Sequence, residues 1–235
     1  MRPLALVYRG KAARPQGCST AVATLLRSSR WGFDVRYVGR QEDLALTPDV
    51  LARAVLYAQP GGGELEPAYR RMRKHETTIR DFVANGGRYL GFCLGGYLAG
   101  ATPGFGLLPG DTDQYIATRG ATIASSRDTL VQVRWRGRPR QLYFQDGPAF
   151  LVRPGVPGVA VLARYPNGAI AALTAPFGSG TVGVVGPHPE ATHDWYDDTG
   201  LVAPDGLAAD LGHDLVDTVM GRGSAPVQRP RSYAT

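Results

Sequence analysis

Short apolar runs alternate with helix-like segments through the first hundred residues of the chain. In the helix-like segments the apolar residues recur three or four positions apart, as Val22, Leu25 and Leu26 do. The predicted strands cover 4–9, 33–39, 54–63 and 88–93, and the predicted helices cover 19–29, 67–87 and 94–101. Because strands that alternate with helices are typical of a parallel sheet covered on both faces, the pattern predicts an α/β fold.

Three positions predict where these helices begin and end. Ser19 or Thr20 is expected to be the N-cap of the first helix, since a short hydroxyl side chain can accept a hydrogen bond from a free backbone N–H group. Pro67 suits the first turn of the second helix, and the pair Gly86-Gly87 suits its end.

The pattern changes after about residue 102. Strand-like runs separated by turn dipeptides cover 129–137, 140–147, 159–168 and 170–178. No linker-like stretch precedes them, so we expect an antiparallel extension of the same sheet. A buried glycine-rich strand at 180–190 and a closing helix at 206–219 follow. Residues 1–220 are therefore expected to form a single domain, and 221–235 a disordered tail.

The composition excludes several classes of protein. The chain has 235 residues, of which 43% are hydrophobic and 20% charged, and no apolar run is long enough to span a membrane. The N-terminal apolar stretch is too short for a signal peptide, so we expect a cytoplasmic protein. The positive charges are scattered arginines, and the densest basic run, 70–75, reads as a solvated helix face rather than a nucleic-acid patch. Neither a cofactor nor a metal is expected, since the two cysteines have no zinc-site spacing.

Candidate chemistry begins at Cys93, in the stretch GFCLGGYLAG (91–100). Gly91 and Gly95 flank it at two residues on either side, which is the spacing of a nucleophile elbow between a strand and a helix. The N–H groups of a helix that starts at Leu94 would favour the thiolate form of Cys93. A buried small hydrophobic residue is the alternative interpretation, and the spacing alone does not decide between the two.

A thiolate needs a base, and His188 is the best placed of the four histidines. It lies in GPHPE (186–190), after a predicted buried strand, and Pro189 forces it into an extended conformation. In an extended chain His188 and Glu190 point to the same side, so the carboxylate can orient the imidazole. The alternative is a proline-rich turn with a solvated histidine.

The glycine loop of QPGGG (59–63) offers backbone N–H groups for an oxyanion. Gly61, Gly62 and Gly63 follow a predicted strand, and the N–H of Leu94 would supply a further donor. By itself this run is equally consistent with a flexible turn. It is no phosphate-binding loop, because no Lys-Ser or Lys-Thr follows it.

Taken together, QPGGG, GRYLGFCLGGYLAG, FQDGPAF and GPHPE resemble the biotin-protein ligase N-terminal domain family, a branch of the class I glutamine amidotransferase-like superfamily. The resemblance runs from about residue 3 to about residue 195. It implies a flavodoxin-like three-layer sandwich with a mostly parallel sheet. It also implies that Cys93 is the nucleophile, His188 the general base and Glu190 the orienting acid.

One departure from the superfamily pattern concerns the substrate. Glutamine-hydrolysing members typically carry Gly-x-Gln or Met-Gln after the elbow leucine, where this chain has Gly95, Gly96 and Tyr97. We therefore expect an enzyme that attacks an amide C–N bond of a small molecule or peptide through a thioester, as a hydrolase or an acyl transferase. The alternatives are an ammonia-supplying glutaminase subunit of a partner synthetase and a non-catalytic binding or regulatory domain. The oligomeric state is left open.

The loop after the first strand carries further candidates. Cys18 is expected at the same sheet edge as Cys93, as a small hydrophobic residue or else as a second thiol or part of the pocket wall. Arg9, Lys11 and Arg14 form either an ordinary surface connection or a cationic rim for an acidic substrate.

Overall fold

Five parallel strands form the centre of the computed structural model, which describes residues 2–221. Their order across the sheet is β2-β1-β3-β4-β11. Every neighbouring pair among them is parallel. The strands are β1 (Leu4–Tyr8), β2 (Asp34–Val38), β3 (Leu56–Gln59), β4 (Arg88–Phe92) and β11 (Gly180–Val185). Since all five point the same way, the loops that follow them lie at one edge of the sheet, as the site prediction requires.

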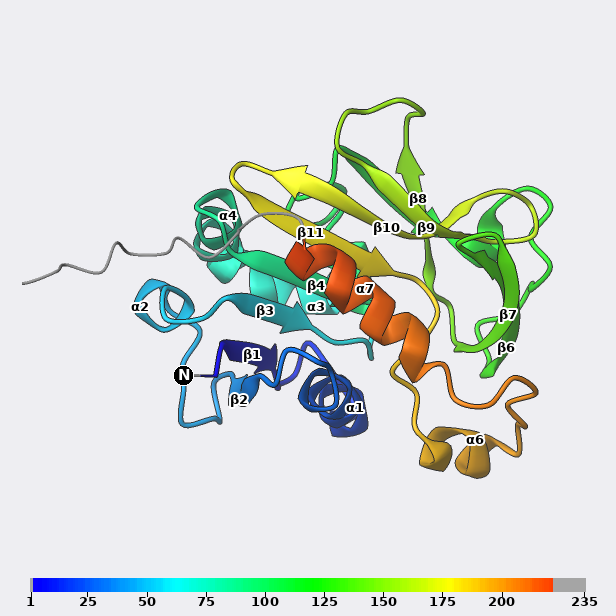
Figure 1. The fold of residues 1–235 in the computed structure, drawn as a ribbon, viewed down its shortest axis with the longest axis horizontal. Coiled ribbons are helices and arrows are strands. Elements are labelled where there is room, and N and C mark those ends of the chain that lie inside the picture. The colour runs from blue at the N-terminus through cyan, green and yellow to red at the C-terminus, as the bar shows by residue number, and fades with distance from the viewer. Residues whose placement is uncertain (1, 222–235) are drawn as a thin grey trace, which may run out of the picture.

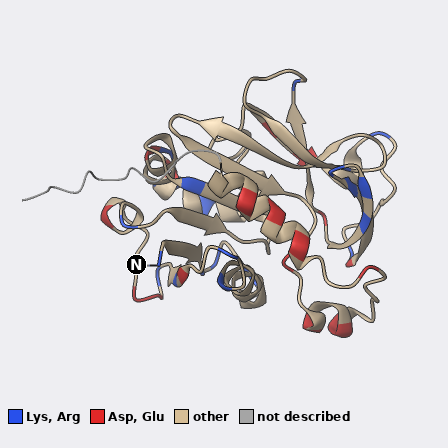
Figure 2. Ribbon diagram, in the orientation of Figure 1, with Lys and Arg blue, Asp and Glu red and all other residues tan. Residues whose placement is uncertain are grey.

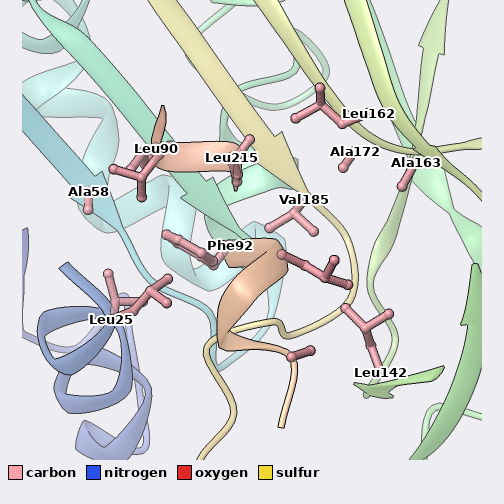
Figure 3. Packing of buried hydrophobic residues seen from close by; sticks show 14 of the residues in the cluster. Leu25, Ala58, Leu90, Phe92, Leu142, Leu162, Ala163, Ala172, Val185 and Leu215 are labelled. Atoms are coloured by element: carbon pink, nitrogen blue, oxygen red, sulfur yellow. The ribbon is translucent and has the colours of Figure 1, made fainter. Parts of the chain in front are cut away.

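Helices cover both faces of this parallel sheet (Figure 1). One face packs against α1 (Gln16–Arg27) and α7 (Ala209–Gly221), and the other against α4 (Glu76–Ala84) and α5 (Leu94–Leu98), with α3 (Leu65–Met72) beside α5. Successive strand residues alternate between the two resulting cores. The α1/α7 core contains Leu90, Phe92, Val185 and Leu215 (Figure 3). The predicted three-layer α/β fold is confirmed.

The second half of the chain extends the sheet with antiparallel strands, as predicted. β10 (Ile170–Phe177) pairs with β11 and is followed across the sheet by β9 (Ala160–Arg164), β6 (Thr129–Trp135) and β7 (Arg138–Phe144). Two strands were not predicted: β5 (Gly110–Gln114) and β8 (Pro148–Val152), which pair with each other. The β5 sequence, GDTDQ, is polar throughout and therefore lacks the apolar alternation of a strand.

Two salt bridges connect α7 to the β6–β7 hairpin of the antiparallel extension. Figure 2 shows acidic residues along α7 and basic residues on the β6–β7 hairpin. Arg140 pairs with Asp210 at 2.6 Å, and Arg136 pairs with Asp214 at 2.7 Å. Both pairs are partly accessible to solvent, so packing of the α7 apolar face is expected to contribute more to stability than the charges do.

The predicted helix ends need corrections. α1 begins at Gln16 after Pro15, so Ser19 and Thr20 lie inside the helix and neither is its N-cap. The Ser19 hydroxyl instead donates to the Tyr8 carbonyl at 2.9 Å, which fixes the helix to β1. The helix predicted at 67–87 is three segments, α3, η1 (Arg73–His75) and α4. Pro67 does lie in the first turn of α3, and Gly86 follows the end of α4 with φ 103°.

Two short helices were missed, α2 (Pro48–Leu51) and α6 (His193–Thr199), and a 3-10 turn, η2 (Tyr115–Ala117), follows β5. Gly221 belongs to α7 rather than to the predicted tail, and 222–235 lie outside the described residues. Within 2–221 no helix is both long and apolar enough to cross a membrane.

Candidate active site

Cys93 sits on a sharp turn between β4 and α5. Its φ is 48°, a left-handed conformation that side chains other than glycine rarely adopt and that costs about 1–3 kcal/mol. The turn depends on close backbone contacts, because a Cβ on Gly91 would lie 2.3 Å from the Gly95 carbonyl oxygen. A Cβ on Gly95 would lie 1.9 Å from the carbonyl oxygen of Gln59. Position 93 is therefore a sharp strand-to-helix turn that leaves no room for a side chain at position 91 or 95.

The Cys93 side chain is 8% exposed and faces two backbone segments from elsewhere in the chain. Its thiol donates to the carbonyl oxygen of Gln145, in the β7–β8 loop, at 3.6 Å. Gly61 lies between Cys93 and His188, because a Cβ placed on Gly61 would be 3.3 Å from the Cys93 Cβ and 3.0 Å from the His188 Cε1. A side chain at position 61 would therefore press against both Cys93 and His188.

His188 and Glu190 form a buried pair behind Cys93. The Nδ1 atom of His188 lies 2.9 Å from Oε1 of Glu190, and the two side chains are 3% and 0% exposed. The main chain fixes His188, since its N–H donates to the Tyr143 carbonyl oxygen at 2.9 Å. The Trp195 ring packs edge-on against the imidazole at 5.1 Å. The His-x-Glu pattern therefore brings together the two groups that the sequence predicted.

The surroundings of His188 favour its protonated form. Burial lowers the pKa of the imidazole, but the charge of Glu190, the charge of Cys93 and hydrogen bonding to both raise it. The net result is a pKa raised from 6.5 to about 10. With Nδ1 on the carboxylate, the other ring nitrogen is the one available to Cys93 or to a substrate.

A cavity of about 690 Å³, here called the active-site cavity, opens over Cys93. Four further residues that the sequence predicted for substrate or oxyanion binding line it: Gly62, Gly63, Leu94 and Tyr97. Leu94 is the first residue of α5, so its N–H has no acceptor within the helix. Gly61, His188 and Glu190 lie behind this lining, against Cys93.

Sequence reasoning missed the acidic character of this cavity. Glu64, Glu66, Asp113 and Asp146 line it, and its lining residues include no lysine or arginine. Asp146 has φ 47°, and its Oδ1 is buried without a hydrogen-bond partner among the described residues. Burial raises the pKa of Asp146, a bond from Gln114 lowers it, and the charge of Glu64 raises it further. The local sequence around Asp146, FQDG, belongs to one of the motifs quoted above and by itself does not indicate an acidic cavity wall.

Tyr97 connects the elbow to this acidic wall. Its hydroxyl donates to the carbonyl oxygen of Asp146 at 3.0 Å, so α5 holds the β7–β8 loop in place. Gly96, next to it, packs against β8: a Cβ there would lie 3.1 Å from the Phe150 ring and 3.2 Å from the Pro148 ring. A larger residue at position 96 would therefore need β8 to move.

The candidate residues that follow β1 lie in different places in the structure. Cys18 is 5% exposed in α1. Its burial, and to a lesser degree the charges of Glu190 and Cys93, raise the pKa of its thiol to about 12. Arg9 pairs with Glu42 at 2.6 Å, and Arg14 approaches the glycine loop through its backbone carbonyl. Lys11 lines a different cavity. The cationic rim for the active site, one of the alternatives for this loop, is therefore not formed.

Within residues 2–221, no three histidine, cysteine, aspartate or glutamate side chains come together in a way that could hold a metal ion. The residues that accompany Cys93 are the buried His188–Glu190 pair and the glycine-loop residues Gly62 and Gly63.

Comparison with known proteins gives sequence matches over parts of the chain. Residues 4–117 match the family model described as biotin-protein ligase, N terminal. The chain is 27% identical to the imidazole glycerol phosphate synthase subunit HisH of Acaryochloris marina over 135 residues, which are 52% of this chain and 63% of that subunit. It is also 27% identical to the biotin-protein ligase of Schizosaccharomyces pombe over 170 residues, which are 59% of this chain and 26% of the ligase. The chain thus spans less than two thirds of these relatives.

Solved structures match over most of the chain. A glutamine amidotransferase from Thermotoga maritima superimposes with a TM-score of 0.60 at 12% identity, covering 93% of this chain and 98% of its own. Another glutamine amidotransferase gives 0.57 at 19% identity, covering 84% and 99%. Identities this low establish a common fold only. Residues 4–117 thus match the biotin-protein ligase N-terminal family, and the chain has the glutamine amidotransferase class I-like fold that its motifs predicted.

Proposed function

We propose that this chain is a cysteine-nucleophile enzyme that attacks an amide C–N bond through a thioester. The proposal rests on one observation above all: Cys93 is held at φ 48° over an open cavity, with the buried His188–Glu190 pair directly behind it. A strained elbow, a buried base and an orienting carboxylate are the parts that a cysteine nucleophile needs.

In the proposed first step, the Cys93 thiolate attacks the amide carbonyl carbon and forms a C–S bond. The carbonyl oxygen becomes an oxyanion, which the N–H of Leu94 and the backbone N–H groups of the glycine loop (61–63) stabilise. His188, oriented by Glu190, donates its proton to the departing amine as the C–N bond breaks. In the second step His188 takes a proton from water, the water attacks the thioester, and the C–S bond breaks.

The negative charge of the cavity lining limits the class of substrate that we propose. Four carboxylates and no lysine or arginine face the space over Cys93, so an anionic group beside the scissile amide would be repelled. A positively charged group would be attracted, and the unpartnered Oδ1 of Asp146 offers it an acceptor. We therefore propose amides that carry a cationic group, such as amides of basic amino acids.

A second candidate function is hydrolysis of glutamine, with the released amide nitrogen passed to a partner synthase that incorporates it into its product. It is supported by the similarity to synthase subunits and by the shared fold with glutamine amidotransferases. Two features oppose free glutamine as the substrate. The described cavity offers no cationic side chain for its α-carboxylate, and Gly96 leaves no side chain where glutamine-hydrolysing members carry a larger one.

Ammonia release from a panel of primary amides tests both candidates. The panel comprises arginine amide, lysine amide, glutamate α-amide and glutamine. We expect release from the basic amides and none from glutamate α-amide. Cys93→Ala should abolish this release, and the matched variant Cys18→Ala should keep it, because triad members act as a unit while Cys18 lies outside the proposed machinery.

If Cys93→Ala retains full activity, the proposed mechanism is wrong. If glutamine is the only amide hydrolysed, the second candidate replaces the first.

A further inference from the structure

A second cavity, of about 750 Å³, lies at the same edge of the sheet, beyond the ends of β1 and β2. Three segments that are distant in sequence form its walls: the loop after β1, the loop after β2 and the end of α3 with η1. It shares no lining residue with the active-site cavity. Its charged lining side chains are Lys11, Arg40, Arg71 and Lys74, and we call this cavity the basic pocket.

No acidic side chain of the described residues lines the basic pocket. Within 2–221 none of Lys11, Arg40 and Lys74 takes part in a salt bridge. Arg71 donates one N–H to the Pro67 carbonyl oxygen at 2.6 Å and keeps the rest of its guanidinium for a ligand. Lys11 and Lys74 are also the only two lysines of the chain, against twenty-four arginines.

The uncharged part of the lining gives the pocket a partly apolar floor. Tyr8 is 8% exposed and Leu46 is 5% exposed. Burial lowers the pKa of His75, and the charge of Lys74 lowers it too. A hydrogen bond with the Leu46 backbone raises it, and the net shift is downward, which favours the neutral imidazole. The pocket therefore combines four positive side chains with a floor that can take an apolar or aromatic group.

We propose that the basic pocket binds a small phosphorylated molecule. Four cations around one cavity suit a group with two or more negative charges, and lysine and arginine are the usual partners of phosphate oxygens. The volume lies within the range of about 300–1,000 Å³ that small-molecule sites have. An extended nucleic acid fits less well, because the charges surround one cavity rather than line a strip.

The basic pocket is distinct from the active site but connected to it by one loop. Lys11 lines the basic pocket, and three residues later the Arg14 carbonyl oxygen lies 2.3 Å from the place that a Cβ on Gly62 would take. One loop therefore contributes to the wall of the basic pocket and also contacts the glycine loop of the active-site cavity. Binding itself requires neither Cys93 nor its chemistry.

Calorimetric titration with inorganic pyrophosphate tests the proposal. The variant Lys11→Gln/Lys74→Gln removes two exposed charges from the pocket, and Arg53→Gln/Arg153→Gln removes two exposed charges from outside it. We expect the pocket variant to bind pyrophosphate at least about tenfold more weakly than the wild type, and the control variant to bind equally well. Cys93→Ala should bind normally, which separates this proposal from that of the amide chemistry.

Lysine-selective acetylation provides an independent measurement, since the chain has only these two lysines. Pyrophosphate should slow acetylation of both Lys11 and Lys74, as mass spectrometry of the peptides would show. The proposal is wrong if the pocket and control variants bind pyrophosphate alike, or if the wild type does not bind it. It is also wrong if a short single-stranded RNA protects the lysines and pyrophosphate does not.

Discussion

Replacing Glu190 with glutamine should change the charge state of His188. The substitution keeps the shape of the side chain but removes the negative charge that lies 2.9 Å from the imidazole Nδ1. Both side chains are almost fully buried, so water cannot substitute for the lost carboxylate. Burial, which is the largest influence on this histidine, then favours the neutral ring.

The expected size of the effect follows from the His188 pKa. A rise from 6.5 to about 10 corresponds to roughly 5 kcal/mol in favour of the protonated ring. The charge of Glu190 is the largest single influence that raises this pKa, followed by the charge of Cys93. In Glu190→Gln the pKa should therefore fall by at least about two pH units, and the ring should be neutral above pH 8.

Nitrogen-detected NMR titration of the imidazoles measures this directly. The other three histidines provide internal references in the same spectrum. In the wild type the His188 signals should stay those of a protonated ring between pH 6 and 9, and in Glu190→Gln they should titrate within that range or below it. Glu42→Gln, which removes a carboxylate from the distant ion pair with Arg9, should leave His188 unchanged.

Stability should follow the same charge. Because the folded pKa of His188 is raised, its contribution is fully present below pH 6.5 and is lost as the pH rises through about 10. Urea unfolding of the wild type should therefore show a decline between pH 7 and 10 that is smaller in Glu190→Gln. The prediction is wrong if His188 of the wild type titrates near pH 6.5, or if His188 of the wild type and of Glu190→Gln titrate at the same pH.

Three further outcomes are expected. Gly95→Ala should destabilise the protein by at least about 2 kcal/mol in urea unfolding, because its Cβ would overlap the Gln59 carbonyl of β3. Gly17→Ala should be neutral, because its Cβ would lie in open space, and equal effects of the two variants would contradict the close packing around Cys93. Tyr97→Phe removes the hydrogen bond from the Tyr97 hydroxyl to the Asp146 carbonyl oxygen. The value of kcat/KM should fall about fivefold, which corresponds to the loss of about 1 kcal/mol of transition-state binding. An unchanged kcat/KM would show that this bond does not position the cavity wall. Cys18 should resist iodoacetamide at pH 7 in the folded protein because it is buried and its pKa is raised to about 12, and labelling there by mass spectrometry would refute this.

The candidate triad could be predicted because the sequence itself carries the constraints. Gly91 and Gly95 mark a turn where two backbone segments nearly touch, and the structure shows contacts that exclude any side chain at either position. Pro189 extends the chain at His188, so the side chain two residues later must point the same way. Local backbone chemistry of this kind can be read from one segment at a time.

The two cavities could not be predicted, since each depends on segments that are distant in sequence. Glu64 follows the glycine loop, Asp113 lies in β5 and Asp146 in the β7–β8 loop, and no local pattern says that they face one cavity. β5 was missed for the same reason, because its pairing with β8 rather than its own polar sequence makes it a strand. Lys11 follows β1 and Lys74 lies in η1, and they line one cavity only in the folded chain.

The pH dependence of alkylation at Cys93 tests the central claim most directly. Iodoacetamide labelling of the wild type and of His188→Gln would be followed by mass spectrometry from about pH 5 to 9. If the His188–Glu190 pair activates the thiol, the wild type should be labelled rapidly well below pH 8.5, and the variant should react slowly there and faster as the pH rises. Identical profiles that both rise towards pH 8.5 would contradict a nucleophilic role for Cys93.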